Sequence, residues 1–545
     1  MRRTRVLVGL VLVALIAPGA ARAAPADPYV IYSANNFADG GVILRTDPGA
    51  GSLVEISRNG PQGALFEAPF DLAVEADGSL LVADMGQLCT PQQPRCADDG
   101  RIIRVDPLTG RQSLLAGGPP LVDPAGLAVG PNGDVYVADN FEADDGGAVI
   151  RIDPATGAKT LISEGNLLAL PFGILVDRDG SLVVSNRVVP TRCLPGLPGR
   201  LVRVQPADGS QQLLSQGGLF RYPLGVALDG AGRIVFANEC GPNGLLRVVS
   251  EAIQSPLSPN GDGDVLVTPE RLALDPEGDF LVSDWSLGDG DGGIVKVDAE
   301  TGVQSLLRQG DLFNHPMGIA AVVNRPPTAA LTPVRPVVAA GERVRLDASA
   351  SRDAEGLRLA YEWDLDGNGV FELGTGALSA ATRTWRRHGR VTVHVRVNDP
   401  HGGSAVAQSV VAVDGSIPRI TDLRIGSKVL GVSRRSGAGV ARRATERPPR
   451  STKLRFKLSE AARVRVLLRR LPCRGPTRSG RRCVRRSFTK LGRPGENTLR
   501  LRARGLRPGT YRLSVRARDA VGHEAAQRKL RIRVVRLTPW GARRA

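Results

Sequence analysis

A repeated segment constrains this chain more than any other feature of its sequence. The segment begins with Pro, one further residue and usually Gly, and it ends in a hydrophobic stretch closed by Asp or Asn, as in PAGLAVGPNGDVYVAD from Pro124. Copies begin 46 to 55 residues apart at Pro69, Pro124, Pro171, Pro223, Pro269 and Pro316. The first five continue with short alternating runs separated by turn dipeptides, which predicts four antiparallel strands per unit. Four-stranded units of this period are typical of β-propeller blades.

The two ends of the repeat indicate how many blades there are. The copy at Pro316 supplies one strand, PMGIAAV, whereas residues Tyr29 to Ile56 supply three strands without a first one. One C-terminal strand beside three N-terminal strands completes a sixth blade. The ring is then closed, and the blade edges that a linear array would expose are covered. We therefore predict an all-β chain in which residues 29–322 form a six-bladed β-propeller.

These blades resemble NHL-repeat propellers and, more loosely, the gluconolactonase-like and virginiamycin-B-lyase-like six-bladed proteins. The resemblance rests on the Pro-x-Gly-hydrophobic-Ala start and the Val-Ala-Asp end of the motif, and it implies a fold rather than a reaction. Gluconolactonase-like proteins hold a metal with a Glu, Asn and Asp set, but Asp71 stands here where the Glu would open the first blade. Virginiamycin-B-lyase-like proteins use a His, and the propeller contains only His315.

Polar side chains at the start or after the second strand of most blades are the candidate site residues of the propeller. They are Asn36, Asp71, Asp84, Asp139, Asn140, Asn186, Asn238, Glu239 and Asp284. A ring of such oxygens could hold a hard cation. Alternatively, an Asp or Asn that closes a strand caps the turn with its own side chain. The recurrence in nearly every blade favours the second hypothesis.

Residues 325–414 form a second predicted domain after a Pro-rich start. The segments LDASAS, YEWDLDGNG and VRVNDPHGG resemble a PKD domain, an Ig-like extracellular module, which implies a spacer or a protein- or carbohydrate-contacting role. Asp364, Asp366 and Asn368 have the opening spacing of a calcium-binding EF-hand loop. The twelfth position is Thr375 instead of the usual Glu, so calcium is a possible cofactor with an incomplete ligand set.

The C-terminal part of the chain is strongly basic. Residues 415–545 contain 38 Lys+Arg and 6 Asp+Glu, a net of +32, whereas the remaining 414 residues contain 34 and 48, a net of −14. We predict a basic flexible linker at 415–450 and, at 451–537, strands with one apolar and one cationic face. The segment PGTYRLSVRARDAVGH resembles Ig-like or fibronectin-type-III-like C-terminal modules of exported actinobacterial proteins.

This charge asymmetry suggests an anionic partner. A cell-envelope polymer is the partner that we expect, because the module has few aromatic residues on which nucleic acid bases could stack. A solvated basic surface without a partner is the alternative.

The N-terminus and the cysteines both indicate export. Residues 1–24 have a basic start, an apolar run and the triplet Ala21-Arg22-Ala23, which is the layout of a secretory signal peptide and leaves no transmembrane segment in the mature chain. Six cysteines in an exported chain favour disulfides. The local pairs are Cys89 with Cys96, Cys193 with Cys240, and Cys473 with Cys483.

Together these patterns predict a secreted or envelope-associated binding protein. The propeller would bind an extracellular protein or carbohydrate, the PKD domain would act as a spacer, and the basic module would act as an anchor. The competing hypotheses are a metal-dependent lactonase- or lyase-like enzyme at the propeller mouth and a purely structural spacer. So few histidines allow no Ser-His-Asp or Cys-His grouping, which favours binding over catalysis.

Overall fold

The computed structural model describes residues 27–35, 40–61, 63–86, 99–140, 146–187, 199–239, 244–250, 253–259, 264–287, 291–310, 312–332, 335, 337–432, 448–471 and 484–537. In these ranges every regular element is a strand, and no helix is long and apolar enough to cross a membrane. The chain divides into two compact units. The first unit runs to Thr328 and includes Arg352–Ala360 and Asn398–Ala405, and the second contains the rest.

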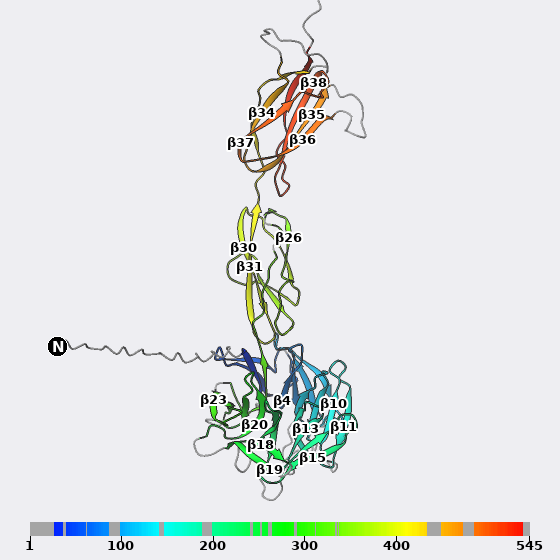
Figure 1. The fold of residues 1–545 in the computed structure, drawn as a ribbon, viewed down its shortest axis with the longest axis vertical. Helices are drawn as coiled ribbons and strands as arrows, with labels where there is room; N and C mark the ends of the chain where they lie inside the picture. The colour runs from blue at the N-terminus through cyan, green and yellow to red at the C-terminus, as the bar shows by residue number, and fades with distance from the viewer. Residues whose placement is uncertain are drawn as a thin grey trace, which may run out of the picture. The chain divides into compact units, whose positions relative to one another are not determined.

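The first unit contains six sheets of four strands, which are the blades of a propeller (Figure 1). Blade 1 is β4 (Pro69–Val74), β5 (Leu80–Asp84), β6 (Arg101–Val105) and β7 (Gln112–Gly117). Blade 2 is β8 (Pro124–Val129), β9 (Val135–Asp139), β10 (Ala148–Ile152) and β11 (Lys159–Glu164). Blade 3 is β12 (Leu170–Val176), β13 (Leu182–Arg187), β14 (Arg200–Val204) and β15 (Gln211–Gln216).

The remaining blades follow the same plan. Blade 4 is β16 (Pro223–Leu228), β17 (Ile234–Asn238), β18 (Gly244–Ser250) and β19 (Ile253–Pro259). Blade 5 is β20 (Pro269–Leu274), β21 (Phe280–Asp284), β22 (Gly293–Val297) and β23 (Gln304–Gln309). Blade 6 is β24 (Pro316–Val323), β1 (Tyr29–Asn35), β2 (Val42–Asp47) and β3 (Ser52–Arg58).

Blade 6 closes the ring in the way that the sequence predicted. β24 pairs antiparallel with β1, and Tyr29 lies opposite Val323. The first strands of successive blades contact one another in the order β4, β8, β12, β16, β20, β24 and back to β4, so they line the centre of the ring. The second, third and fourth strands of each blade lie progressively further out.

The alternation of apolar and polar residues explains the cores between the blades, and bulges protect the outer edges. Apolar residues on facing sides of adjacent blades bury one another, as Ala138 and Val149 of blade 2 do against Val184 and Val202 of blade 3. The outermost strand of every blade carries a register shift against its neighbour. Such bulges twist an exposed edge and discourage pairing with another chain.

Glycine at the third motif position lets the innermost strands approach closely. A Cβ atom on Gly126 would lie 2.2 Å from the Phe172 carbonyl oxygen, and one on Gly225 would lie 2.6 Å from the Arg271 Cα. Gly173 and Gly318 are equally confined by the next blade. Two blades depart from this rule, because they carry Asp71 and Arg271 at the equivalent position.

The PKD region forms one sheet of five strands and one of two. The larger contains β25 (Val337–Ala339), β31 (Ser404–Asp414), β30 (Gly389–Asn398), β27 (Ala360–Asp364) and β28 (Leu373–Gly376), in that order. The smaller pairs β26 (Arg343–Asp347) with β29 (Ala380–Thr384). Trp363 is fully buried and donates its indole N–H to Thr375 Oγ1 at 3.0 Å, so the one polar atom of this ring is satisfied.

The basic module is a second sandwich with its own core. One sheet contains β32 (Ile420–Ile425), β34 (Ser451–Leu458) and β37 (Gly495–Arg502). The other contains β33 (Val429–Val432), β39 (Arg528–Arg536), β38 (Gly509–Arg518), β35 (Ala462–Leu471) and β36 (Val484–Gly492). Tyr511 is buried and donates its hydroxyl to the Arg507 carbonyl at 2.8 Å, a tyrosine corner of the kind found in Ig-like sandwiches.

The sandwich begins earlier in the chain than the sequence indicated. β32 and β33 fall inside the range 415–450 that was predicted as a linker, and they pair with β34 and β39. β33 has only four residues and joins its sheet in parallel, so no sustained alternation reveals it.

Candidate functional site

One Asp or Asn stands at the end of the second strand in every blade, and each is fully buried. These residues are Asn35, Asp84, Asp139, Asn186, Asn238 and Asp284. The Asp139 carboxylate accepts the backbone N–H groups of Val122, at 2.9 Å, and Asp123, at 3.1 Å. Asp84, Asp284 and Asn238 accept equivalent pairs of N–H groups from the segments that precede their own blades. These bonds support the hypothesis that the ring residues cap turns.

Burial makes these carboxylates harder to ionise. It raises the pKa of Asp139 to about 6 despite the two N–H bonds, which act in the opposite direction. Burial likewise raises the pKa values of Asp84 and Asp284. The equivalent Asn238 makes the same type of backbone contact without any charge.

Some amide oxygens in or next to the ring remain available. The side-chain oxygens of Asn35, Asn140 and Asn186 are buried and accept no hydrogen bond. The predicted Asn36 lies outside the described residues, and Asn35 takes the ring position of its blade. Glu239 is buried directly after Asn238. A water molecule or a hard cation is the kind of partner that such oxygens could take.

Asp71 has a different environment from the ring residues. Its Oδ2 lies 3.4 Å from Nε of Arg271, and both side chains are more than nine-tenths buried. The carboxylate also accepts the backbone N–H groups of Leu72, at 2.9 Å, and Leu127, at 3.0 Å. Arg271 donates a hydrogen bond of 2.6 Å to the Ala125 carbonyl. Asp71 and Arg271 therefore form a buried ion pair with additional polar partners.

This ion pair spans the centre of the propeller. Arg271 belongs to blade 5, whereas its partners Asp71 and Ala125 belong to blades 1 and 2, which are not neighbours of blade 5. The Arg271 guanidinium also lies 4.2 Å from the centre of the Phe172 ring in blade 3. Phe172 in turn meets Phe70 of blade 1 edge to face at 5.1 Å. Side chains from blades 1, 3 and 5 and a backbone carbonyl of blade 2 thus fill the middle of the ring.

Burial destabilises both charges of this pair. It raises the pKa of Asp71 and lowers the pKa of Arg271, whereas the attraction between the two groups acts in the opposite direction. A second guanidinium, that of Arg187, lies 4.2 Å from the Phe172 ring and donates to Tyr222 Oη at 2.6 Å. Its repulsion adds to the lowering of the Arg271 pKa, and the attraction of Asp71 offsets part of the cost of burying the Arg271 charge.

The residues next to the pair do not form a cation cage. Each follows the opening proline of an innermost strand; they are Phe70, Ala125, Phe172, Leu224, Glu270 and Met317. Only Glu270 among these six can offer a carboxylate, whereas Ca²⁺ prefers six to eight oxygen ligands. Phe70, Ala125, Phe172 and Leu224 instead pack into one apolar cluster.

The calcium-like loop of the PKD region uses its oxygens internally. Asp364 accepts the N–H groups of Gly367 and Gly369, at 2.7 and 2.9 Å, and its Oδ2 lies 3.0 Å from Nδ1 of His394. Asp366 and Asn368 accept N–H groups two residues ahead. Glu372, which the sequence reading passed over, lies close enough to Asp364 and Asp366 to share an ion. Calcium binding here stays a prediction.

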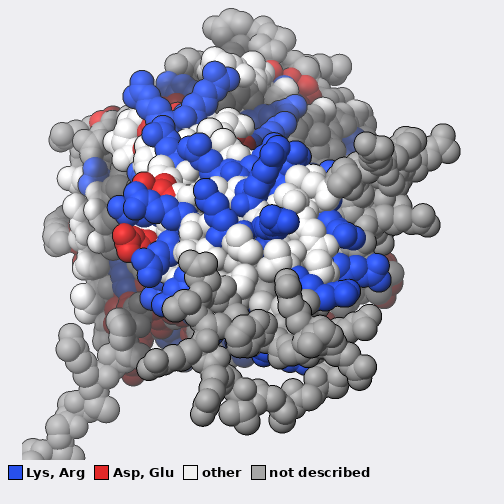
Figure 2. Space-filling view, turned by 90° about the horizontal axis from the view of Figure 1, so that it is seen from above, with Lys and Arg blue, Asp and Glu red and all other residues white. Residues whose placement is uncertain are grey.

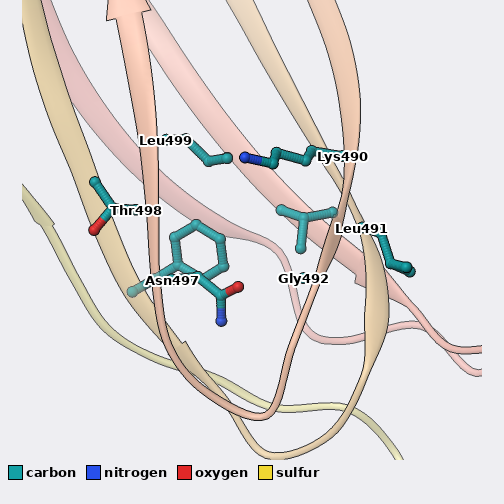
Figure 3. A pocket seen from close by; sticks show the side chains of 8 residues that line it. Lys490, Leu491, Gly492, Asn497, Thr498 and Leu499 are labelled. Carbon is teal, nitrogen blue, oxygen red and sulfur yellow. The ribbon is translucent and has the colours of Figure 1, made fainter.

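A small pocket lies in the basic module between β36 and β37. Its volume is about 30 Å³, enough for one or two water molecules. In Figure 3, Lys490 and Leu499 extend toward each other across it, whereas Leu491 points away. Its lining residues are Phe456, Val464, Lys490, Leu491, Gly492, Asn497, Thr498 and Leu499. This pocket is too small to be the site of a sizeable ligand.

All six cysteines lie outside the described residues, so the three disulfides stay predictions. Arg271 and Phe172, by contrast, are central residues that sequence reasoning missed. A signal for Arg271 was present, because Asp71 and Arg271 are the two non-glycine residues at one repeat position and carry opposite charges.

The fold and the comparisons agree on the class of protein. The family model of the PKD domain matches residues 324–413, and that of the NHL repeat matches residues 121–142. The chain thus contains a six-bladed propeller with an NHL repeat in it and a PKD domain, a module typical of extracellular proteins.

Solved structures similar to this chain are distant in sequence. One is the nidogen/laminin complex, at 14% identity, with 54% of this chain and 98% of that chain covered and a TM-score of 0.40. Another is a gluconolactonase from Xanthomonas campestris, at 14% identity, with 60% and 96% covered and a TM-score of 0.35. Comparison with curated proteins gives no match.

Proposed function

We propose that this chain is an exported, non-enzymatic binding protein. The propeller presents a platform for an extracellular protein or carbohydrate, and the PKD domain acts as a spacer. The basic module holds an anionic polymer of the cell envelope. The signal-peptide-like N-terminus and the PKD match support export. The net charge of +32 on residues 415–545 supports the anchoring role.

The filled centre of the propeller is the observation that carries this proposal. A metal-dependent hydrolase needs polar groups that converge on an open position for substrate. Here the Arg271–Asp71 pair and the Phe70 and Phe172 rings occupy the centre, and Glu270 is the single carboxylate among the six residues beside them. Ligands would therefore bind on the face of the propeller and not inside it.

A metal-dependent lactonase- or lyase-like activity is the second candidate. The observation that favours it is the set of buried amide oxygens on Asn35, Asn140 and Asn186 that accept no hydrogen bond. A cation at the edge of the ring could use them together with neighbouring carboxylates.

The test is metal content and lactone hydrolysis of the purified full chain, beside its co-sedimentation with isolated cell-envelope fragments. We expect less than stoichiometric metal, no hydrolysis, and salt-sensitive sedimentation. Asn186→Asp and Asn238→Asp are matched variants, since Asp occupies the same position in blades 1, 2 and 5. Stoichiometric metal whose affinity changes in Asn186→Asp but not in Asn238→Asp, together with hydrolysis, would establish the enzyme instead.

A further inference from the structure

We propose that the outer face of the sheet β33-β39-β38-β35-β36 is a docking surface for a linear phosphate-bearing polymer. This inference rests on the proposed anchoring role of the basic module, and it names the face and the chemistry of the partner. The face is called the arginine face below. It consists of the cations among the outward side chains of the three central strands: Arg463, Arg465, Arg469, Arg512, Arg516, Arg518, Lys529, Arg531 and Arg533.

Strand alternation places these nine cations on one side. Val464, Val466 and Leu468 of β35 point into the core, whereas Arg463, Arg465 and Arg469 alternate with them and are exposed. β38 and β39 follow the same pattern, with Leu513 and Ile532 in the core. Arg512 is half-buried and the other eight cations are exposed. Figure 2 shows how strongly Lys and Arg predominate over Asp and Glu on the side turned toward the viewer.

The register places like charges directly opposite each other. Arg465 pairs with Arg516, and Arg463 pairs with Arg518. In a third row, Arg512 lies between Arg469 on one side and Arg531 on the other. Directly opposite side chains in a sheet have Cβ atoms about 4.5–5.5 Å apart, and like charges there are destabilising. The free module therefore carries a repulsion that an anionic ligand would relieve.

The other sheet of the module differs and serves as an internal comparison. Its outer face also carries opposed cations, Arg424 with Arg455 and Lys453 with Arg500, but acidic residues are placed among them. Asp422 lies 3.3 Å from Lys457 Nζ, and Glu496 stands opposite Lys457 in the register. On the arginine face, the Glu524 carboxylate lies 3.8 Å from Arg516. Among the described residues, the cations are thus more numerous and less interspersed with acidic residues on the arginine face than on the other sheet.

The type of cation points to phosphate. Eight of the nine residues are Arg, whose planar fork donates two parallel hydrogen bonds to one anionic group. A phosphate group presents its acceptor oxygens tetrahedrally, so forks from two opposing strands can share it. A planar carboxylate has only two oxygens, which form a single edge for one such fork. Rows of opposed guanidinium groups therefore suit a chain of phosphates better than a chain of carboxylates.

The experiment measures binding of the full chain to long-chain polyphosphate and to polyglutamate, across a range of salt concentrations. The face variant is Arg465→Ser, Arg512→Ser and Arg516→Ser together. The control variant is Arg424→Ser, Arg455→Ser and Arg500→Ser, which removes the same charge from the other sheet. A third variant changes Arg465, Arg512 and Arg516 to Lys, so that it keeps the charge but removes the forks. Thermal unfolding of each variant checks that the module is folded.

We expect polyphosphate to bind more tightly than polyglutamate and to raise the melting temperature of the module. Each lost contact should lower the log–log salt slope by about 0.7, so the face variant should lose about 2 in slope and about 50-fold in affinity at 0.15 M salt. The control variant should lose less than a few-fold, and the Lys variant should fall between the two.

Two outcomes would overturn the inference while leaving the anchoring role intact. Equal losses in the face and control variants would show that net charge alone binds the polymer. Equal or stronger binding of polyglutamate would remove the preference for phosphate. If the chain binds neither polymer and does not sediment with envelope fragments, the proposed anchoring function itself fails.

Discussion

The propeller and the basic sandwich are both built mainly from antiparallel strands, but they differ in where their charged side chains lie and in what those side chains contact. The propeller places charged groups in its interior and gives each a defined partner, as with Asp71 and Arg271. The basic sandwich keeps its core apolar and places like charges opposite each other on its surface, as with Arg465 and Arg516. The charged pair in the propeller therefore has a structural role, whereas the charges on the sandwich face the proposed external partner.

The energetic consequences differ in the same way. Removing one member of a buried ion pair leaves an uncompensated charge in a medium that solvates it poorly. Removing one member of an exposed like-charge pair removes a repulsion that water and salt already weaken. Equivalent substitutions in the two regions should thus differ in size and even in sign.

The largest effect is expected from deleting residues 27–58, which removes β1, β2 and β3. Blade 6 would keep only β24, and blades 5 and 1 would each lose a packing surface. We expect no cooperative thermal unfolding of the propeller and little soluble protein. As a control, deletion of residues 415–545 should leave the melting of the propeller unchanged, because the core of the basic sandwich contains only its own residues.

The next effect concerns the ion pair in the propeller centre. Arg271→Met should lower the free energy of unfolding by about 3–5 kcal/mol, since it leaves the Asp71 carboxylate buried without its cation. Adding Asp71→Asn should recover part of this loss. Denaturant titration measures both. The matched surface variant Arg465→Met should change stability by less than about 0.5 kcal/mol. Equal losses in both single variants would contradict the contrast between the regions.

A third prediction uses pH. Because burial raises the pKa of Asp139 to about 6 in the folded chain, folded protein binds more protons than unfolded protein between about pH 4 and 6. This carboxyl therefore adds stability at low pH, up to about 3 kcal/mol, and the contribution is lost as pH rises through 6.

Asp139→Asn should abolish that contribution and retain the two backbone contacts, as Asn238 does in blade 4. Its stability relative to the parent chain should then be lower at pH 4.5 than at pH 7.5. Asp153→Asn is the control, since backbone N–H bonds lower the pKa of Asp153 and its contribution to stability changes only below about pH 4, so its relative stability should be the same at about pH 4.5 and 7.5. A parallel pH profile for the parent and Asp139→Asn would contradict the buried-charge interpretation.

The smallest effect is expected on the basic sandwich. Arg463→Glu replaces a like-charge pair with an opposite-charge pair beside Arg518 and should raise stability by about 0.2–1 kcal/mol. Arg536→Glu changes the net charge equally but lies opposite Val432, so it should have less effect. Chemical denaturation at low salt measures the difference. Identical gains would attribute the effect to net charge and not to the register.

Much of the fold followed from the sequence, because repetition and alternation are local signals. The proline-led motif predicted the blades, and the incomplete repeats at Tyr29 and Pro316 predicted closure. The alternation of Arg with Leu or Val predicted a cationic face. The position of Arg465 directly opposite Arg516 could not be predicted from the sequence, because cross-strand register depends on turns that alternation does not specify.

The residues of the candidate site were harder to predict from the sequence, for a related reason. The motif placed Asp71 and Arg271 at equivalent positions of different blades, yet only the closed ring shows that these positions meet across the centre. The polar ring residues were predicted from the sequence. Their hydrogen bonds to Val122 and Asp123, and to the equivalent segments of other blades, depend on the backbone path that leads into the first strand of each blade.

The pairing of Tyr29 with Val323 also fixes when this protein can finish folding. β1 is among the first segments to be synthesised, and its partner β24 follows roughly 300 residues later. At 5–20 residues per second, that delay is about 15–60 s. For this whole interval β1 presents an unpaired strand edge. The nascent chain is therefore most open to misassembly just before β24 is made, and a chaperone that shields β1 would act in this period.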